Sequence, residues 1–237
     1  ELWEPDFDKD EHHVTEMRRL LAIAGVTART VHAAFGGALD PSSPNPDVRA
    51  AGIEAFRAAL DLAVRMQAQI VVVHASAEPI LDEERAARIA EAQRSIRTMA
   101  KMAGNVGCRI AVELLPRSCL GNSAQELLAL LEGIDPQTAG VCLDTNHMMA
   151  DFVALPDAVR TLGPRLIALH CSDYDGVDEK HWPPLRGVID WPAFLAALYD
   201  VGFPGPLNYE ATLDGETPAE KLAFLESNYA QLVSGRG

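Results

Sequence analysis

The sequence contains no apolar run long enough to cross a membrane. No stretch approaches the ~20 apolar residues that a membrane-spanning helix needs, and residues 1–13 are too charged for a secretory signal. We therefore expect a cytoplasmic protein with no membrane partner.

Basic residues are also scarce. The 237 residues include 20 Lys and Arg against 34 Asp and Glu, which gives a formal net charge of −14. This sign of charge repels the phosphate backbone of nucleic acids at long range. Nucleic acid is therefore not an expected partner.

Cysteines are few, and they are not grouped. Cys108, Cys119, Cys142 and Cys171 show no C-x-x-C spacing, and three of them lie in or beside apolar runs. This pattern indicates buried free thiols in a reducing compartment rather than disulfides or a thiolate metal cluster.

The sequence does show short apolar runs that alternate with longer helical segments, which is typical of parallel βαβ units. The runs lack polar alternation, as expected for strands covered on both faces. The predicted strands are residues 26–35, 70–75, 109–114, 140–144, 166–170 and 207–210. The predicted helices are residues 14–24, 47–69, 83–103, 123–132, 156–162, 191–201 and 218–232.

Counting residues 1–3 as the end of a further strand gives about seven strands, whereas a closed barrel needs eight. We therefore predict one (β/α)₈ TIM-barrel domain over residues 1–237 that lacks its first strand and helix. The rival fold is an open doubly wound sheet, but no G-x-G-x-x-G turn follows an early strand.

Polar side chains stand at or near the ends of the predicted strands, where parallel strands bring them to one rim. These residues are His32, His74, Glu113, Asp144, His170 and Glu210. Acids gathered at an enclosed barrel mouth cost several kcal/mol unless cations compensate them, and Arg117 and Arg186 are the nearby basic candidates in loops. A bound divalent metal is the more economical explanation. A set rich in oxygen suits Mn²⁺, Mg²⁺ or Co²⁺ and tolerates Zn²⁺.

Several segments together resemble the xylose isomerase-like TIM-barrel superfamily of sugar phosphate isomerases and epimerases. They are VELLP with Glu113, CLDTNH with Asp144 and His147, ALHCSD with His170, HWPPLRGVIDW from His181 to Trp191, and NYEAT with Glu210. The resemblance covers nearly the whole chain. It implies that Glu113, Asp144, His170 and Glu210 hold the metal, with Mn²⁺ the expected ion.

The resemblance also implies the chemistry. Glu113 and Glu210 would act as the acid and base that move a proton α to a carbonyl through an enediolate. The substrate would be a small sugar or polyol. We expect it to be bound by His147, His74, His32, His181, Trp182 and Arg186, with the loop of residues 172–189 over the site. The sequence leaves a homo-oligomer open.

Two departures from the ketose 3-epimerases of this superfamily leave an alternative open. Those enzymes have Glu six residues after the first ligand and Arg six after the His ligand, where this chain has Cys119 and Gly176. An inosose-type dehydratase with the same base and metal is therefore an alternative.

A second alternative is an apurinic-site endonuclease. These enzymes share the barrel and build a three-zinc cluster, for which this chain has look-alikes at His32, His74, His147, Glu179 and His181. The acidic composition and the few loop cations argue against DNA binding. A catalytically dead binding module would require a broken ligand set, and the set is intact.

Overall fold

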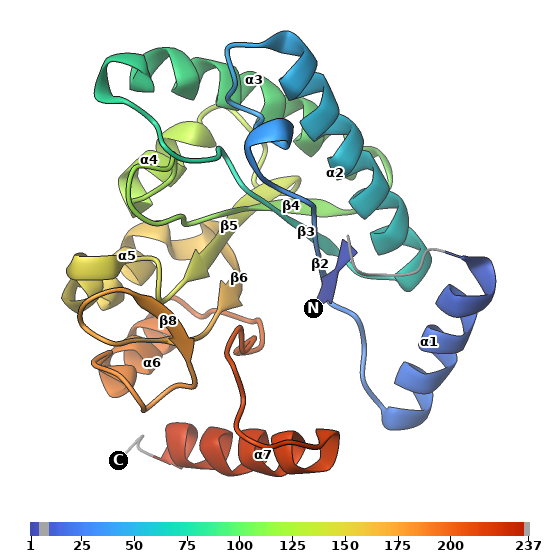
Figure 1. The fold of residues 1–237 in the computed structure, drawn as a ribbon, viewed down its shortest axis with the longest axis vertical. Coiled ribbons are helices and arrows are strands. Elements are labelled where there is room, and N and C mark those ends of the chain that lie inside the picture. The colour runs from blue at the N-terminus through green and yellow to red at the C-terminus, as the bar shows by residue number, and fades with distance from the viewer. Residues whose placement is uncertain (5–9, 235–237) are drawn as a thin grey trace.

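The computed structural model describes residues 1–4 and 10–234, so the ends of the predicted 1–237 domain fall partly outside the described residues. Six parallel strands, paired in chain order, form one curled sheet (Figure 1). They are β1 (Leu2–Trp3), β2 (Thr30–His32), β3 (Ile70–Val73), β4 (Arg109–Glu113), β5 (Ala139–Asp144) and β6 (Leu166–His170). The sheet is a half-barrel, which confirms the predicted TIM-barrel class.

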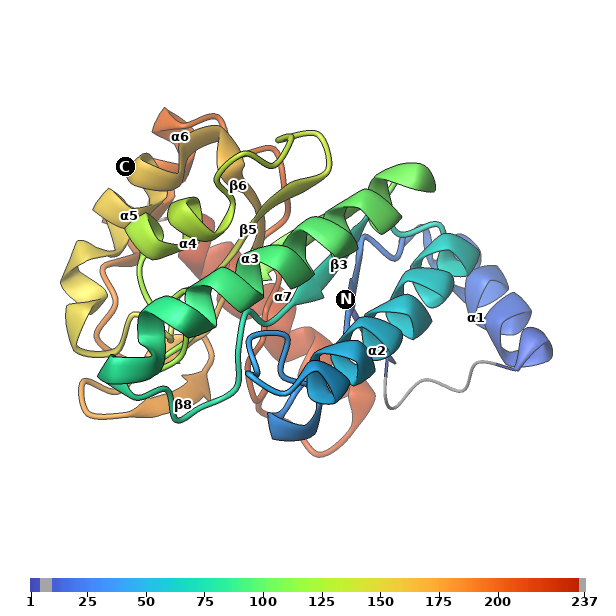
Figure 2. The ribbon, with the colours of Figure 1, turned by 90° about the horizontal axis from the view of Figure 1, so that it is seen from above.

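Helices follow most strands and cover the outer side of the sheet (Figure 1). They are α1 (Glu11–Ala24), α2 (Pro46–Met66), α3 (Asp82–Asn105), α4 (Ala124–Leu130), α5 (Leu155–Leu162), α6 (Trp191–Asp200) and α7 (Pro218–Ser234). Short 3₁₀ turns are η2 (Gly37–Leu39), η3 (Met149–Ala154) and η4 (Gly163–Arg165). Figure 2 shows α2 and α3 running side by side. Within the described residues, every helix is too short or too polar to span a membrane.

Side-chain caps explain where several helices begin. Ser123 accepts a hydrogen bond from the backbone N–H of Glu126, and Asp190 does the same for Ala193. Asn45 caps α2, whose first residue is Pro46. An acceptor at the cap and proline in the first turn satisfy or remove backbone donors that a helix leaves unpaired. These local signals placed the predicted helix starts within about three residues of the observed ones.

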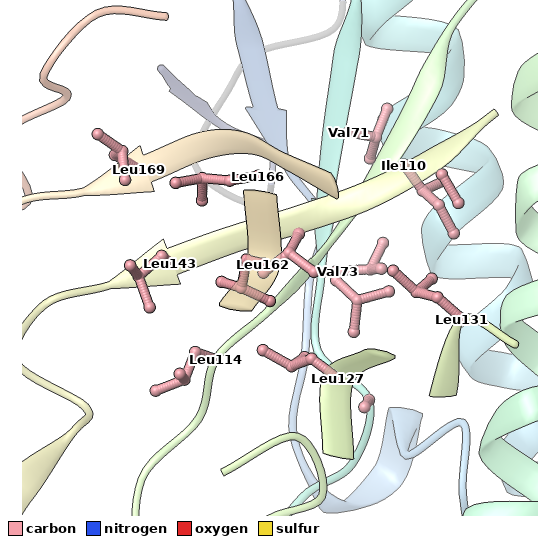
Figure 3. Packing of buried hydrophobic residues seen from close by; sticks show 14 of the residues in the cluster. Val71, Val73, Ile110, Leu114, Leu127, Leu131, Leu143, Leu162, Leu166 and Leu169 are labelled. Carbon is pink, nitrogen blue, oxygen red and sulfur yellow. The ribbon is translucent and has the colours of Figure 1, made fainter. Parts of the chain in front are cut away.

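The two faces of the sheet have different cores. Residues such as Val71, Val73 and Ile110 point outward and pack against the helices in one large apolar cluster (Figure 3). The opposite face buries a small cluster of Val72, Ala111, Cys142 and Ala168. Small side chains on this inner face suit a sheet that curls around it. All four cysteines are free and buried, as predicted.

Two predicted features differ from the structure. The predicted strand 207–210 is only an isolated bridge between Cys171 and Tyr209. Pro204 and Pro206 lie just before it, and a proline has no N–H to donate to a ladder. The predicted irregular loop 172–189 contains a short antiparallel hairpin, β7 (Asp173–Tyr174) paired with β8 (Glu179–Trp182).

A substitution of Gly52 tests whether η2 packs tightly against α2. A Cβ at this position would overlap the backbone oxygen of Leu39. Helix propensity alone predicts that Gly52→Ala stabilises the protein by about 1 kcal/mol, whereas overpacking predicts a loss of about 1–3 kcal/mol. We expect the loss, measured by urea unfolding. Gly37→Ala, where a Cβ meets open space, is the control and should change the unfolding free energy by less than about 0.5 kcal/mol. A stabilised Gly52→Ala variant would show that η2 does not press on α2.

Candidate metal centre and its cavity

Three carboxylates and one imidazole converge at the carboxyl ends of the strands. Glu113 ends β4, Asp144 ends β5 and His170 ends β6, while Glu210 follows the bridge residue Tyr209. One potential ligand atom from each residue lies within 4.8 Å of those of the others. Glu113, Asp144 and His170 are buried, whereas the side chain of Glu210 is 42% exposed. The four residues predicted as metal ligands therefore lie together.

This cluster has more hydrogen-bond acceptors than donors. His170 Nδ1 donates to Glu113 Oε1 at 3.0 Å and also lies 2.7 Å from Glu210 Oε2. One ring nitrogen carries at most one proton, so it cannot serve both oxygens. Asp144 Oδ2 and Glu210 Oε2 are buried without a hydrogen-bond partner. Oxygen atoms in this state fit a divalent cation, and the donor set suits Mn²⁺, Mg²⁺, Co²⁺ or Zn²⁺.

The pKa values of Asp144 and Glu113 are shifted because several charged groups lie close together in a buried site. Burial, together with the nearby carboxylates of Glu210 and Glu113, raises the pKa of Asp144 to about 6, although the neighbouring His147 acts to lower it. Burial would also raise the pKa of Glu113, but the imidazoles of His170 and His74 outweigh it and hold this pKa well below its ordinary value. Glu113 is therefore ionised at neutral pH.

Glu113 also contacts two further histidines. His32 Nε2 lies 3.0 Å and His74 Nε2 3.1 Å from Glu113 Oε2. His32 Nδ1 donates to the backbone oxygen of Ala33, so both of its ring nitrogens face acceptors. Burial lowers the pKa of His32, but the hydrogen bond with Glu113 more than offsets this and the net shift is upward. His32, His74 and Glu113 form a second group whose atoms are close enough to hold an ion.

Glu1 is a site residue that the sequence prediction missed. Its Oε1 lies 3.0 Å from His170 Nε2, whereas Glu113 and Glu210 lie at the other ring nitrogen, Nδ1. A carboxylate there favours the orientation in which Nδ1 faces the candidate ligands. The position of Glu1 beside the short strand β1 was the one available signal, since it directly precedes Leu2.

A cavity of about 700 Å³ opens beside this cluster. Glu113 and Glu210 line it, together with four histidines that were predicted to bind substrate: His32, His74, His147 and His181. Trp3 and Phe35 form an aromatic part of the wall, and Phe35 stacks on His74 with ring centroids 3.8 Å apart. The cavity is large enough for a small organic ligand.

Two of these histidines are held by backbone carbonyls. His147 Nδ1 donates to Leu114 O at 2.9 Å, which leaves Nε2 facing Glu179 Oε2 at 3.6 Å. His181 Nδ1 lies 3.1 Å from the backbone oxygen of Glu210, and His181 has a φ of 47°. The hairpin therefore lies over the site, and its residue 181 reaches the candidate ligand Glu210.

Trp182 and Arg186 were predicted to bind substrate, but they are not among the described residues that line the cavity. Glu179 and His181 of the same strand β8 do line it. Arg186 pairs instead with Asp214 and lies over the ring of Phe224.

Comparison with known proteins agrees with the TIM-barrel fold described above. A family model described as xylose isomerase-like TIM barrel matches residues 1–228. The ketose 3-epimerase of Arthrobacter globiformis is 26% identical over 87% of this chain and 71% of its own length. An uncharacterised protein of Methanocaldococcus jannaschii is 29% identical over 76% of this chain, and the match spans only 63% of that protein.

Solved structures agree at the level of the fold. The crystal structure of a D-tagatose 3-epimerase-like protein superposes with a TM-score of 0.82 at 22% sequence identity. The superposition covers 96% of this chain and 86% of the other.

A substitution of Asp144 tests whether the four candidate ligands bind a divalent ion. Excess Mn²⁺ at about 100 times its Kd should stabilise the protein by about 2.7 kcal/mol, which raises the Tm by roughly 5–10 °C for a chain of this size. Asp144→Asn should lose most of this rise, because the amide removes a charged ligand. It should not lower the Tm measured with a chelator, because the substitution relieves repulsion. Differential scanning calorimetry checks both values.

The control is Asp157→Asn on α5, whose side chain is 84% exposed. This variant should keep the full rise in Tm with Mn²⁺. A normal rise in Asp144→Asn would mean that the ion binds elsewhere.

Proposed function

Because the chain belongs to the xylose isomerase-like TIM-barrel family, we propose that it is a divalent-metal-dependent isomerase or epimerase of a sugar or polyol. The observation that carries the proposal is the convergence of Glu113, Asp144, His170 and Glu210 beside a cavity. The ketose 3-epimerase of Arthrobacter globiformis, at 26% identity, supports the same class of chemistry. Mn²⁺ is the proposed ion, with Mg²⁺, Co²⁺ and Zn²⁺ as alternatives.

A divalent cation held by these four residues would polarise a carbonyl and its neighbouring hydroxyl, and so make the adjacent C–H more acidic. The chain's own residues move the proton. Glu210 lines the cavity and its side chain is 42% exposed, so its carboxylate is placed to take a proton from a carbon of a ligand bound there. Return of a proton to the other face of the same carbon gives an epimer, and return to the neighbouring carbon gives an isomer.

Glu113 is the second acid–base group. The imidazoles of His32, His74 and His170 lie within 3.1 Å of its two oxygens and keep it ionised. A proton received by Glu113 can be compensated within this group of histidines, so the carboxyl can exchange protons without leaving an unpaired buried charge. His147 and His181 stand in the cavity wall, where they can hydrogen-bond substrate oxygens.

A dehydratase acting through the same base remains the alternative on this site, because loss of water from a β-hydroxy carbonyl compound begins with the same removal of a proton. Endonuclease activity has less support. Arg117, the one arginine or lysine among the described residues that line the cavity, pairs with Glu78 and Glu179. Phosphate contacts need free cations at the mouth.

Substitutions of Glu113 and Glu210 test the proposed proton transfer. With Mn²⁺ present, the protein should exchange the proton α to the carbonyl of a ketose or keto-inositol with solvent deuterium, and a chelator should stop the exchange. Glu113→Gln and Glu210→Gln should each slow it by about 10²–10⁴-fold, because an amide cannot take up the proton. His147→Ala should mainly raise KM. The exchange is measured by NMR.

Glu54→Gln is the control for charge loss, since this side chain is 67% exposed on α2. It should exchange at the wild-type rate. If a broad panel of such sugars shows no metal-dependent exchange while abasic DNA is nicked efficiently, the protein is an endonuclease. Loss of water from the substrate, seen by mass spectrometry, would identify the dehydratase.

A further inference from the structure

Glu210 is held differently from the other three candidate ligands. Those three end the paired strands β4, β5 and β6 of the sheet. Glu210 instead follows an isolated bridge, in which the N–H of Cys171 donates to Asn208 O and the N–H of Glu210 donates to Cys171 O. A strand ladder fixes a side chain through a series of repeated hydrogen bonds. These two bonds leave the position of Glu210 to be set by further contacts.

The neighbouring residue, Tyr209, anchors this segment on its outer side. Glu210 lines the cavity, whereas Tyr209 packs against the large apolar cluster between the sheet and the helices. The Tyr209 hydroxyl donates to Asn228 Oδ1 on α7 at 2.8 Å. Because the two residues are adjacent in the chain, a bond that fixes Tyr209 also limits where Glu210 can stand.

Asn228 is an unusual residue for its position on α7. The buried residues of this helix are Asn228 and Leu232. Burying an amide costs free energy unless its polar groups are paired, and both sides of this amide are paired. Oδ1 accepts from Tyr209, and Nδ2 donates to the backbone oxygen of Pro184 at 2.8 Å. The amide therefore links α7 both to the segment that carries Glu210 and to the loop that follows the hairpin.

The hairpin contacts the same segment. His181 Nδ1 lies 3.1 Å from the backbone oxygen of Glu210, and the N–H of Thr212 donates to the backbone oxygen of His181 at 2.9 Å. The chain then runs directly to Pro184, the residue that the amide on α7 binds. The segment that carries Glu210 is therefore tied to the hairpin strand β8 and to α7 at once.

We propose that Asn228 is a positioning residue for the reaction. Its amide holds Tyr209 and the loop after the hairpin to α7, and so fixes where the carboxylate of Glu210 stands relative to the other three candidate ligands. This inference rests on the proposed function for the metal and the proton transfer. The placement of the segment itself can be measured without metal and without turnover.

The first experiment measures backbone hydrogen–deuterium exchange by mass spectrometry, on the full chain with a chelator present. Tyr209→Phe keeps the ring and removes only the hydroxyl. It should speed exchange over residues 208–212 at least about fivefold, because this segment loses its hydrogen bond to α7. Exchange over residues 109–113 of β4 should stay at the wild-type rate. The matched control is Tyr199→Phe on α6, where Tyr199 is 80% exposed, and it should leave both segments unchanged.

The second experiment tests whether this placement matters for the site. Isothermal titration calorimetry should give a Kd for Mn²⁺ about tenfold higher in Tyr209→Phe and in Asn228→Leu, because a loosened ligand has to be ordered on binding. In the proton-exchange assay kcat should fall about tenfold while KM changes less than about twofold, since the base is misplaced and the cavity wall is kept. The double variant should match Asn228→Leu, because both changes break the same contact.

Ser95→Ala is the control for loss of a buried hydrogen bond. Ser95 Oγ, on α3, donates to the backbone oxygen of Pro41 at 2.7 Å. Like Tyr209→Phe, this variant should lower the Tm by roughly 2–4 °C. It should leave the Kd for Mn²⁺ and kcat at their wild-type values.

Unchanged exchange over residues 208–212 in Tyr209→Phe would overturn the proposal. Faster exchange with an unchanged Kd for Mn²⁺ and an unchanged kcat would also overturn it, because Asn228 would then only stabilise the fold. Failure of the proposed reaction differs from both. In that case the wild type binds Mn²⁺ but exchanges no proton of any sugar, and the Kd for Mn²⁺ in Tyr209→Phe still decides whether Asn228 positions Glu210. A wild type that binds no Mn²⁺ would overturn the inference together with the proposed function.

Discussion

Mutual repulsion among Glu113, Asp144 and Glu210 is the constraint on which the centre of this structure depends. Their oxygens and His170 lie within 4.8 Å of one another at a largely buried rim. Nearby donors offset part of the repulsion. The backbone N–H groups of Asn146 and His147 donate to Asp144 Oδ1, and imidazoles surround Glu113. The donors are still too few, and the remaining oxygens are what make a cation the natural complement of the site.

Much of the fold could be predicted from the sequence because its signals are local. The strand predicted at 166–170 matches β6 at both ends, since an apolar run in a buried parallel strand has clear limits. The helices were found from their caps and apolar faces. The convergence of Glu113, Asp144 and His170 was also predictable, because each ends one of three successive parallel strands and the register brings those ends together.

Contacts between loops could not be predicted in this way. The hairpin strand β8 reads EKHW, which has no apolar alternation, and its turn depends on pairing with only two residues of β7. The bridge from Arg117 to Glu78 and Glu179 joins positions 39 and 62 residues apart, and no periodicity links them. The contact between Glu1 and His170 joins the two edges of the curled sheet, so it depends on the curvature that the whole sheet adopts.

The candidate ligands Glu113, Asp144 and His170 sit on strands, whereas Arg117, Glu78 and Glu179 sit on surface segments. This division has an evolutionary consequence. Substitutions in exposed loops usually change stability little, while a change at Glu113, Asp144 or His170 would alter the set of candidate ligands. In a protein with this scaffold, the loop residues around the cavity can therefore change while the candidate ligands on the strands stay the same. Its preference among small molecules can change in this way without loss of the central residues.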